Sequence, residues 1–303
     1  APMLLAGRFI QGLASGVVYA VGTVWLRELA GDAHATSAAV NATAAMAFGF
    51  GAGSIVSAIL VQWVVWPRLL SLVIMFVLVS GAALLTHRLP ETRAGNPLSR
   101  ISIGLPRGTG WGFVCYLAPC GLLVYSFVML AIIAFPIQLA AAGFTQIYFI
   151  QGLSLIIIMA VATGATTLVR KLGPANTGWL AALLGAVGCA LGYIAVQPGH
   201  WPWVLPASIA IGAGSGLAIT SGVVVSDLLT PPERRGGLLA LYYVLVYVGD
   251  CVPTGLSLAW GNRALERGST ILGLAGAALV IALLLAGPGR SLVRRHEHQP
   301  RHA

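Results

Sequence analysis

The chain has 303 residues, of which 58% are hydrophobic and only 8% are charged, and its mean hydropathy is +0.89. A soluble domain carries roughly 25% charged residues, so this composition excludes an ordinary soluble protein and indicates an integral membrane protein. The formal net charge of +9 would suggest nucleic-acid binding in a soluble protein. Here the positions of the arginines decide its meaning.

Nine apolar segments are long enough to cross a bilayer, because a membrane-spanning helix needs about 20 predominantly apolar residues. Lipid cannot satisfy a free backbone amide, so each segment is expected to be a helix. In chain order they cover approximately 2–26, 39–64, 67–87, 111–136, 146–169, 176–196, 203–228, 237–260 and 269–287. The predicted fold class is therefore an all-α integral membrane protein with nine transmembrane helices.

The basic residues lie mostly on one side of this arrangement. Thirteen fall in alternate connections and in the tail: Arg27, Arg88, Arg93, Arg100, Arg107, Arg170, Lys171, Arg234, Arg235, Arg290, Arg294, Arg295 and Arg301. The opposite connections hold three: Arg68, Arg263 and Arg267. By the positive-inside rule the richer side is cytoplasmic. The basic charge is thus interpreted as a topology signal, with the C-terminus in the cytoplasm and no nucleic-acid partner.

The first third of the chain repeats in the last third. A shift of 200 residues places small residues of the first span on those of the seventh: Gly12, Ser15, Gly16 and Gly22 meet Gly212, Ser215, Gly216 and Gly222. The middle three spans have no partner, and a parallel duplication of six helices would supply one as about 100 further residues before Ala1. We therefore expect helices 4–12 of a twelve-helix protein, without the first three.

The repeat predicts four regions. Residues 1–88 would be the last three helices of an N-terminal six-helix half, and residues 89–110 the central cytoplasmic loop. Residues 111–288 would form the C-terminal six-helix half, and residues 289–303 a basic cytoplasmic tail. The longest polar connection lies where the two halves would join.

Four stretches carry a resemblance to a known family: LLAGRFIQGLASG at 4–16, LPETR at 89–93, GATTLVRKLG at 164–173 and PPERRGGLLALYYVLVYVG at 231–249. They resemble parts of the fourth helix, the end of the sixth, the eighth-to-ninth connection and the eleventh helix of the major facilitator superfamily of secondary transporters. The last stretch is similar especially to drug-export-type bacterial members. The segment 49-GFGAGSIVSA-58 departs from the antiporter pattern because Ser54 replaces its proline.

The resemblance implies a secondary active transporter of small organic molecules that works by alternating access. It favours proton-coupled efflux by a monomer in the bacterial cytoplasmic membrane, with the substrate, protons and the lipid bilayer as partners. Proton-coupled uptake of a metabolite is an alternative, as is a truncated remnant that does not transport.

An enzyme is not expected. A membrane-embedded enzyme would need a cluster of acidic, histidine or lysine side chains at one membrane face. The acidic residues of the inner loops instead occur singly: Glu28, Asp32, Glu91, Asp227 and Glu233. We expect no cofactor and no metal, and the histidine-containing segment 295–302 is interpreted as a solvated basic end.

Two charged side chains lie deep inside predicted spans. Arg8 is 19 residues before Arg27 and thus roughly 28 Å from the inner face, so it either reaches the outer headgroups or faces the cavity. The family pattern implies the second role, coupled to proton movement. Asp250 lies about 22 Å from the inner face, where a carboxylate is costly unless it is protonated or paired. It is either a proton carrier or a neutral structural residue.

Other residues are candidates for the cavity and for helix packing. The family pattern implies that Gln11 partners Arg8 or contacts substrate, and aromatic side chains that could line the cavity are Tyr125, Tyr243 and Tyr247. Glycines four residues apart predict close helix contacts: Gly12 and Gly16, Gly49 and Gly53, and Gly212 and Gly216. Three prolines are expected to kink their spans: Pro119, Pro136 and Pro253.

The duplication makes a prediction about mass. The protein in its native membrane should be longer than the 31.3 kDa chain by about 100 residues, because each half of such a fold has six helices. Intact mass spectrometry of the native product measures this directly. A native mass of 31.3 kDa would contradict the duplication argument and favour the non-transporting remnant.

Overall fold

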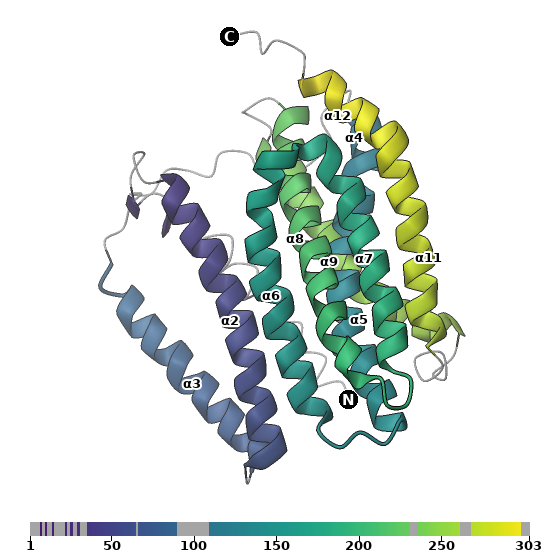
Figure 1. Cartoon of the computed structure of the whole chain (residues 1–303). Helices are drawn as coiled ribbons and strands as arrows, with labels where there is room; N and C mark the ends of the chain where they lie inside the picture. Colours follow the sequence, from purple (N-terminus) through teal and green to yellow (C-terminus); the bar gives the residue numbers. More distant parts are fainter. Residues whose placement is uncertain are drawn as a thin grey trace. The chain divides into compact units, whose positions relative to one another are not determined.

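The computed structural model describes residues 35–64, 66–89, 109–230, 235–260 and 268–297, together with isolated positions among the first 30 (Figure 1). Within these ranges the regular structure is entirely helical. The chain divides into two compact units. The smaller comprises residues 1–49 and 72–99, and the larger comprises residues 50–71 and 100–303.

Two helices precede the central connection, α2 (Ala35–Trp63) and α3 (Pro67–Thr86), and each contributes to both units. The rest of the larger unit contains ten helical elements in chain order. These are α4 (Gly110–Gly112), η2 (Phe113–Leu117), α5 (Ala118–Ala141), α6 (Ile147–Leu172), α7 (Pro174–Ala195), η3 (Trp201–Trp203), α8 (Val204–Leu229), α9 (Arg235–Trp260), α11 (Ser269–Leu284) and η5 (Leu285–Gly289), followed by α12 (Arg290–Glu297).

These helices coincide with eight of the nine predicted spans to within a few residues. The predicted first span, 2–26, lies outside the continuously described ranges. Six helical stretches of the described residues are long and apolar enough to cross a membrane: Leu69–Thr86, Gly110–Ala141, Ile147–Val169, Pro174–Ala195, Trp201–Leu229 and Thr270–Arg295. Two shorter apolar stretches are Phe48–Trp63 and Gly237–Pro253. The helical fold is confirmed, whereas nine crossings and the division into halves stay predictions.

The last helix continues beyond the predicted end of its span at 287. Pro288 would ordinarily end an α-helix, because its ring clashes with the carbonyl oxygen of the residue four positions earlier. Here the chain forms the wider π-helical turn η5 around Pro288, and α12 continues from it to Glu297. The same device precedes Pro119, where η2 leads into α5. Helix α12 is docked, since its Val293 is buried.

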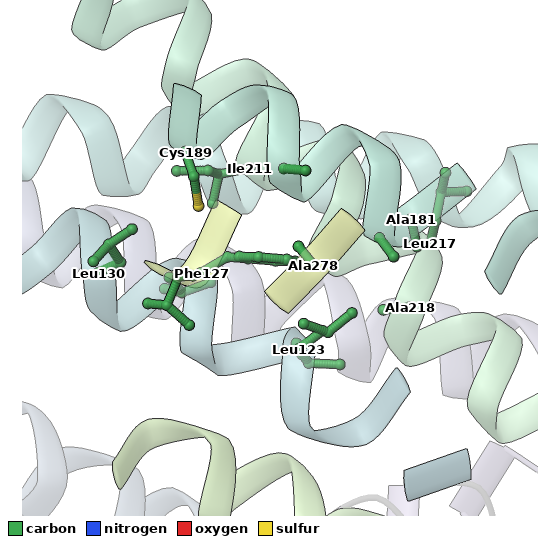
Figure 2. Close-up of a cluster of buried hydrophobic side chains, with 14 of the residues drawn as sticks. Leu123, Phe127, Leu130, Ala181, Cys189, Ile211, Leu217, Ala218 and Ala278 are labelled. Carbon is green, nitrogen blue, oxygen red and sulfur yellow. The ribbon is translucent and has the colours of Figure 1, made fainter. Parts of the chain in front are cut away.

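The core of the larger unit lies among α5, α7, α8, α9 and α11. Figure 2 shows one part of it, to which α5 contributes Leu123, Phe127 and Leu130, and α11 contributes Ala278. Its other labelled residues come from α7 and α8: Ala181, Cys189, Ile211, Leu217 and Ala218. Large side chains of α5 thus face small side chains of α7.

Aromatic side chains of α5 sit on glycines of α7. The pairs are Tyr116 on Gly178, Phe127 on Gly185 and Phe135 on Gly192, and a Cβ atom at any of these glycines would overlap the facing ring. The three glycines are seven residues apart, so they follow one stripe along the helix. Tyr116 also donates a hydrogen bond to the carbonyl oxygen of Pro174 in α7. The absence of side chains on this stripe lets the aromatic rings fill the core.

Glycines of α8 allow direct backbone contact with α6. A Cβ atom at Gly212 would lie 2.6 Å from the carbonyl oxygen of Ile158, and one at Gly216 would overlap the carbonyl group of Ala162. At Gly49 and Gly53 no described atom lies within 4 Å of such a Cβ. Gly12 and Gly16 lie outside the described residues, so the packing role of the four-residue glycine pairs stays a prediction.

The second half of α2, which belongs to the larger unit, packs on the first half of α6. The rings of Trp63 and Phe149 meet edge to face, with centroids 5.4 Å apart. A Cβ atom at Gly152 would lie 2.7 Å from the Cβ atom of Ala58. This contact joins a helix before the central connection to a helix after it.

The α6–α8 contact predicts an asymmetric response to alanine. Gly212→Ala would place a methyl group against a backbone oxygen that cannot move cheaply, so we expect a loss of about 1–3 kcal/mol in unfolding free energy. The matched control is Gly164→Ala in α6, where no described atom lies within 4 Å of a Cβ. That change should be neutral or raise stability by up to about 1 kcal/mol.

Thermal unfolding in detergent, followed with a thiol-reactive dye, measures both changes. The buried thiols of Cys120 and Cys189 become reactive as the helices separate. Equal melting temperatures for the two alanine variants would contradict the close approach of α6 and α8.

Candidate functional site

Helix α9 presents Tyr243, Tyr247 and Asp250 on one face. Their spacing of four and three residues places them one above another along the helix. The two tyrosines are 39% and 50% exposed, and Asp250 is half-buried. Three of the predicted functional residues therefore form a continuous stripe, which is called the α9 stripe below.

Helix α5 adds an aromatic side chain to the α9 stripe. The ring centroids of Tyr125 and Tyr247 are 5.9 Å apart and the rings are tilted by 48°, an arrangement that aromatic pairs favour. Tyr243 contacts Tyr242 in a similar way, at 6.0 Å. Tyr242 itself is buried, and its hydroxyl donates to the carbonyl oxygen of Ala218 at 2.9 Å. The outer tyrosines thus rest on a fixed aromatic base.

The carboxyl group of Asp250 has an unused hydrogen-bonding atom. Its Oδ1 is buried and has no hydrogen-bond partner among the described residues. A buried acceptor without a partner costs about 1–3 kcal/mol, and an ionised carboxylate within a membrane span costs more than a protonated one. This position is therefore chemically suited to a group that takes up a proton or binds a donor from a ligand.

Few ionisable side chains surround Asp250 in the described part of the chain. On α5 the nearest in sequence register are Cys120 and Tyr125, and α11 contains no ionisable side chain. On α8 the only charged residue is Asp227, which by helix rise lies about 20 Å away along the axis. Arg8 and Gln11 lie outside the described residues, so their predicted place beside the cavity stays a prediction.

The backbone before Asp250 makes a contact that sequence reasoning missed. Ser126 of α5 is 2% exposed, and its Oγ lies 2.9 Å from the carbonyl oxygen of Gly249. A Cβ atom at Gly249 would lie 2.5 Å from the carbonyl oxygen of Leu122. The only signal in the sequence is Pro253, which follows Gly249 by four residues and removes the amide that would otherwise bond to it.

No group of three or more metal-binding side chains occurs among the described residues. The four cysteines do not form disulfides; two are buried, Cys115 is half-buried and Cys251 is exposed. The chemistry of the site therefore lies in its carboxyl group, its phenol rings and the hydroxyl of Ser126.

Comparison with known proteins identifies the family. The family model described as the Major Facilitator Superfamily matches residues 1–254. Searches of the curated proteins and of the solved structures give no match. Members of this family are membrane transporters and not enzymes, so the predictions of a transporter and of no enzyme are confirmed. The chain belongs to the major facilitator superfamily and is a multi-pass membrane transporter of small molecules.

Proposed function

We propose that this transporter is a proton-coupled exporter of small organic molecules in the bacterial cytoplasmic membrane, working as a monomer by alternating access. The observation that carries the proposal is Asp250, a membrane-embedded carboxyl group whose buried Oδ1 has no partner in the described residues. Ionisable residues in membrane spans commonly mark ion and substrate pathways.

Asp250 is the proton carrier in this proposal. Loss of its proton leaves a charge that is stabilised only when water or a cation reaches it, and regaining the proton makes the group compatible with a closed site. Each turnover therefore couples opening of the site to one protonation change. Arg8, whose role comes from the family pattern, would supply a balancing positive charge in the other half.

The α9 stripe and Tyr125 are the proposed substrate contacts. Their rings offer flat apolar faces with a hydroxyl at one edge, which suits planar or amphipathic organic molecules. Gln11 would add an amide that can both donate and accept hydrogen bonds. The carboxyl group of Asp250 lies one turn from Tyr247, so substrate and proton would occupy neighbouring positions on α9.

The orientation in this proposal follows the distribution of arginine and lysine. Lys171 near the end of α6 and Arg295 in α12 are exposed, and both belong to the richer set that the positive-inside rule assigns to the cytoplasm. The C-terminus would accordingly be cytoplasmic. Substrate would enter from the cytoplasm or inner leaflet and leave on the opposite side.

Uptake is the second candidate, and one feature of α2 favours it. The antiporter pattern has a proline where this chain has Ser54, and Ser54 donates to the carbonyl oxygen of Phe50 at 2.8 Å inside a continuous helix. The antiporter-type break is therefore absent from the described length of α2. The same residues would then couple entry of a metabolite to entry of a proton.

Replacing the carboxyl group should abolish coupling. In everted membrane vesicles with an acidic interior, an exported compound exchanges for protons and dissipates the pH gradient, which acridine orange fluorescence reports. A panel of planar and amphipathic organic compounds should include at least one that does this with the native protein. Asp250→Asn should eliminate the response because the amide cannot release a proton, and Arg8→Ala should weaken it.

Two results would overturn the proposal. Unchanged pH dependence of transport in both Asp250→Asn and Arg8→Ala would remove proton coupling. Dissipation only when the compound and the protons move in the same direction would favour uptake.

Loss of an aromatic face should weaken substrate binding. For a compound identified in that assay, we expect Tyr247→Ala to raise KM about tenfold, because an aromatic contact contributes about 0.5–1.5 kcal/mol beyond buried area. Tyr247→Phe should stay near the native value. Tyr148→Ala on α6 is the control, since Tyr148 is also exposed but lies outside the α9 stripe. Equal KM values for both alanine variants would exclude Tyr247 from the substrate site.

A further inference from the structure

Two prolines in the described spans leave backbone carbonyl groups without their usual helical donors. Pro136 lies inside α5 and Pro253 inside α9. Because proline has no amide hydrogen, the carbonyl oxygen four residues earlier loses its partner. The two affected carbonyl groups belong to Ile132 and Gly249.

In both places a side chain of a neighbouring helix supplies the missing donor. The side-chain amide of Gln151 in α6 donates to the carbonyl oxygen of Ile132 at 3.0 Å. The hydroxyl of Ser126 in α5 lies 2.9 Å from the carbonyl oxygen of Gly249 in α9. The recurrence of this arrangement at two prolines ties the Ser126 contact to the proline in α9.

The hydroxyl of Ser126 faces two acceptors on two helices. Besides Gly249 of α9, the carbonyl oxygen of Leu122 in its own helix lies 2.5 Å from Oγ. A hydroxyl has a single hydrogen to donate, so it bonds fully to only one acceptor at a time. The bond to Gly249 joins α5 to α9, and the bond to Leu122 leaves the carbonyl group of Gly249 free.

This contact lies at a point of very close approach between the two helices. A Cβ atom at Gly249 would lie 2.5 Å from the carbonyl oxygen of Leu122 and 3.4 Å from the Oγ of Ser126. The next residue along α9 is Asp250. The position of the carboxyl group relative to α5 therefore depends on whether the hydroxyl of Ser126 holds the preceding peptide.

We infer that Ser126 is a positioning residue for Asp250, which it holds against α5 through the carbonyl group of Gly249 in the segment before Pro253. The inference rests on the proposed function, in which Asp250 carries the proton. When the hydroxyl turns to Leu122, the segment is released and the surroundings of the carboxyl group change. Ser126 thereby links the local geometry of α9 to the protonation of Asp250.

Infrared spectroscopy of the purified full-length transporter tests this without a known substrate. The carboxyl stretching band of Asp250 is identified as the band that Asp250→Asn removes, and its intensity is followed as a function of pH. We expect Ser126→Ala to move the midpoint of this titration by about one pH unit, a shift that loss of one hydrogen bond beside a carboxyl group can produce. Ser126→Thr keeps the hydroxyl and should restore the native midpoint.

The matched control is Ser208→Ala in α8. Ser208 is also fully buried, and its hydroxyl donates to the carbonyl oxygen of Val204, four residues earlier in its own helix, at 2.7 Å. Both alanine variants lose one buried hydroxyl and should lose similar thermal stability. Only Ser126→Ala should move the Asp250 titration.

A second variant covers the case in which Ser126→Ala alone folds poorly. Pro253→Ala restores the amide that bonds to Gly249 within α9, so Ser126→Ala in that background should move the midpoint much less. Equal midpoints in the native protein, Ser126→Ala and Ser208→Ala would overturn the positioning role. The absence of any titrating band that Asp250→Asn removes would instead contradict the proposed function.

Discussion

The structure depends on how a membrane helix satisfies the carbonyl group that a proline leaves without a donor. Water supplies such donors in a soluble protein, but the bilayer core does not. In α5 and α9 the donors come from Gln151 and Ser126 on adjacent helices. The prolines therefore make each kinked helix dependent on its neighbour, and they place an exchangeable hydrogen bond directly beside Asp250.

The same requirement for close contact explains the glycines. Hydrogen bonds between helices form only where the backbones come near, and Gly249 allows the carbonyl oxygen of Leu122 to approach α9. Elsewhere, glycines of α7 and α8 receive aromatic rings or the backbone of α6. The resulting core around α5, α7 and α8 is filled without cavities for polar groups, which leaves the polar chemistry to the α5–α9 contact.

Much of the fold could be predicted from the sequence because the bilayer imposes length and polarity on each helix. Pro174, for example, begins α7 two residues from the predicted start, after Gly173 with φ of +76°. The continuation through Pro288 could not be predicted, since a π-helical turn depends on packing between η2 and η5. Asp250 and the tyrosines stood out as polar side chains within apolar spans. Ser126 did not, because a lone serine in such a span is ordinary until its acceptor on another helix is known.

These constraints give the α5–α9 contact a role that neither helix has alone. The aromatic pair of Tyr125 and Tyr247 and the hydroxyl of Ser126 connect the same two helices, on adjacent residues of α5. A molecule that separates the rings would therefore also strain the bond to Gly249. Since Asp250 follows Gly249 directly, substrate contact and proton binding would act on one short segment of α9. Coupling between them then requires no long pathway, only a helix segment with two discrete hydrogen-bonding arrangements.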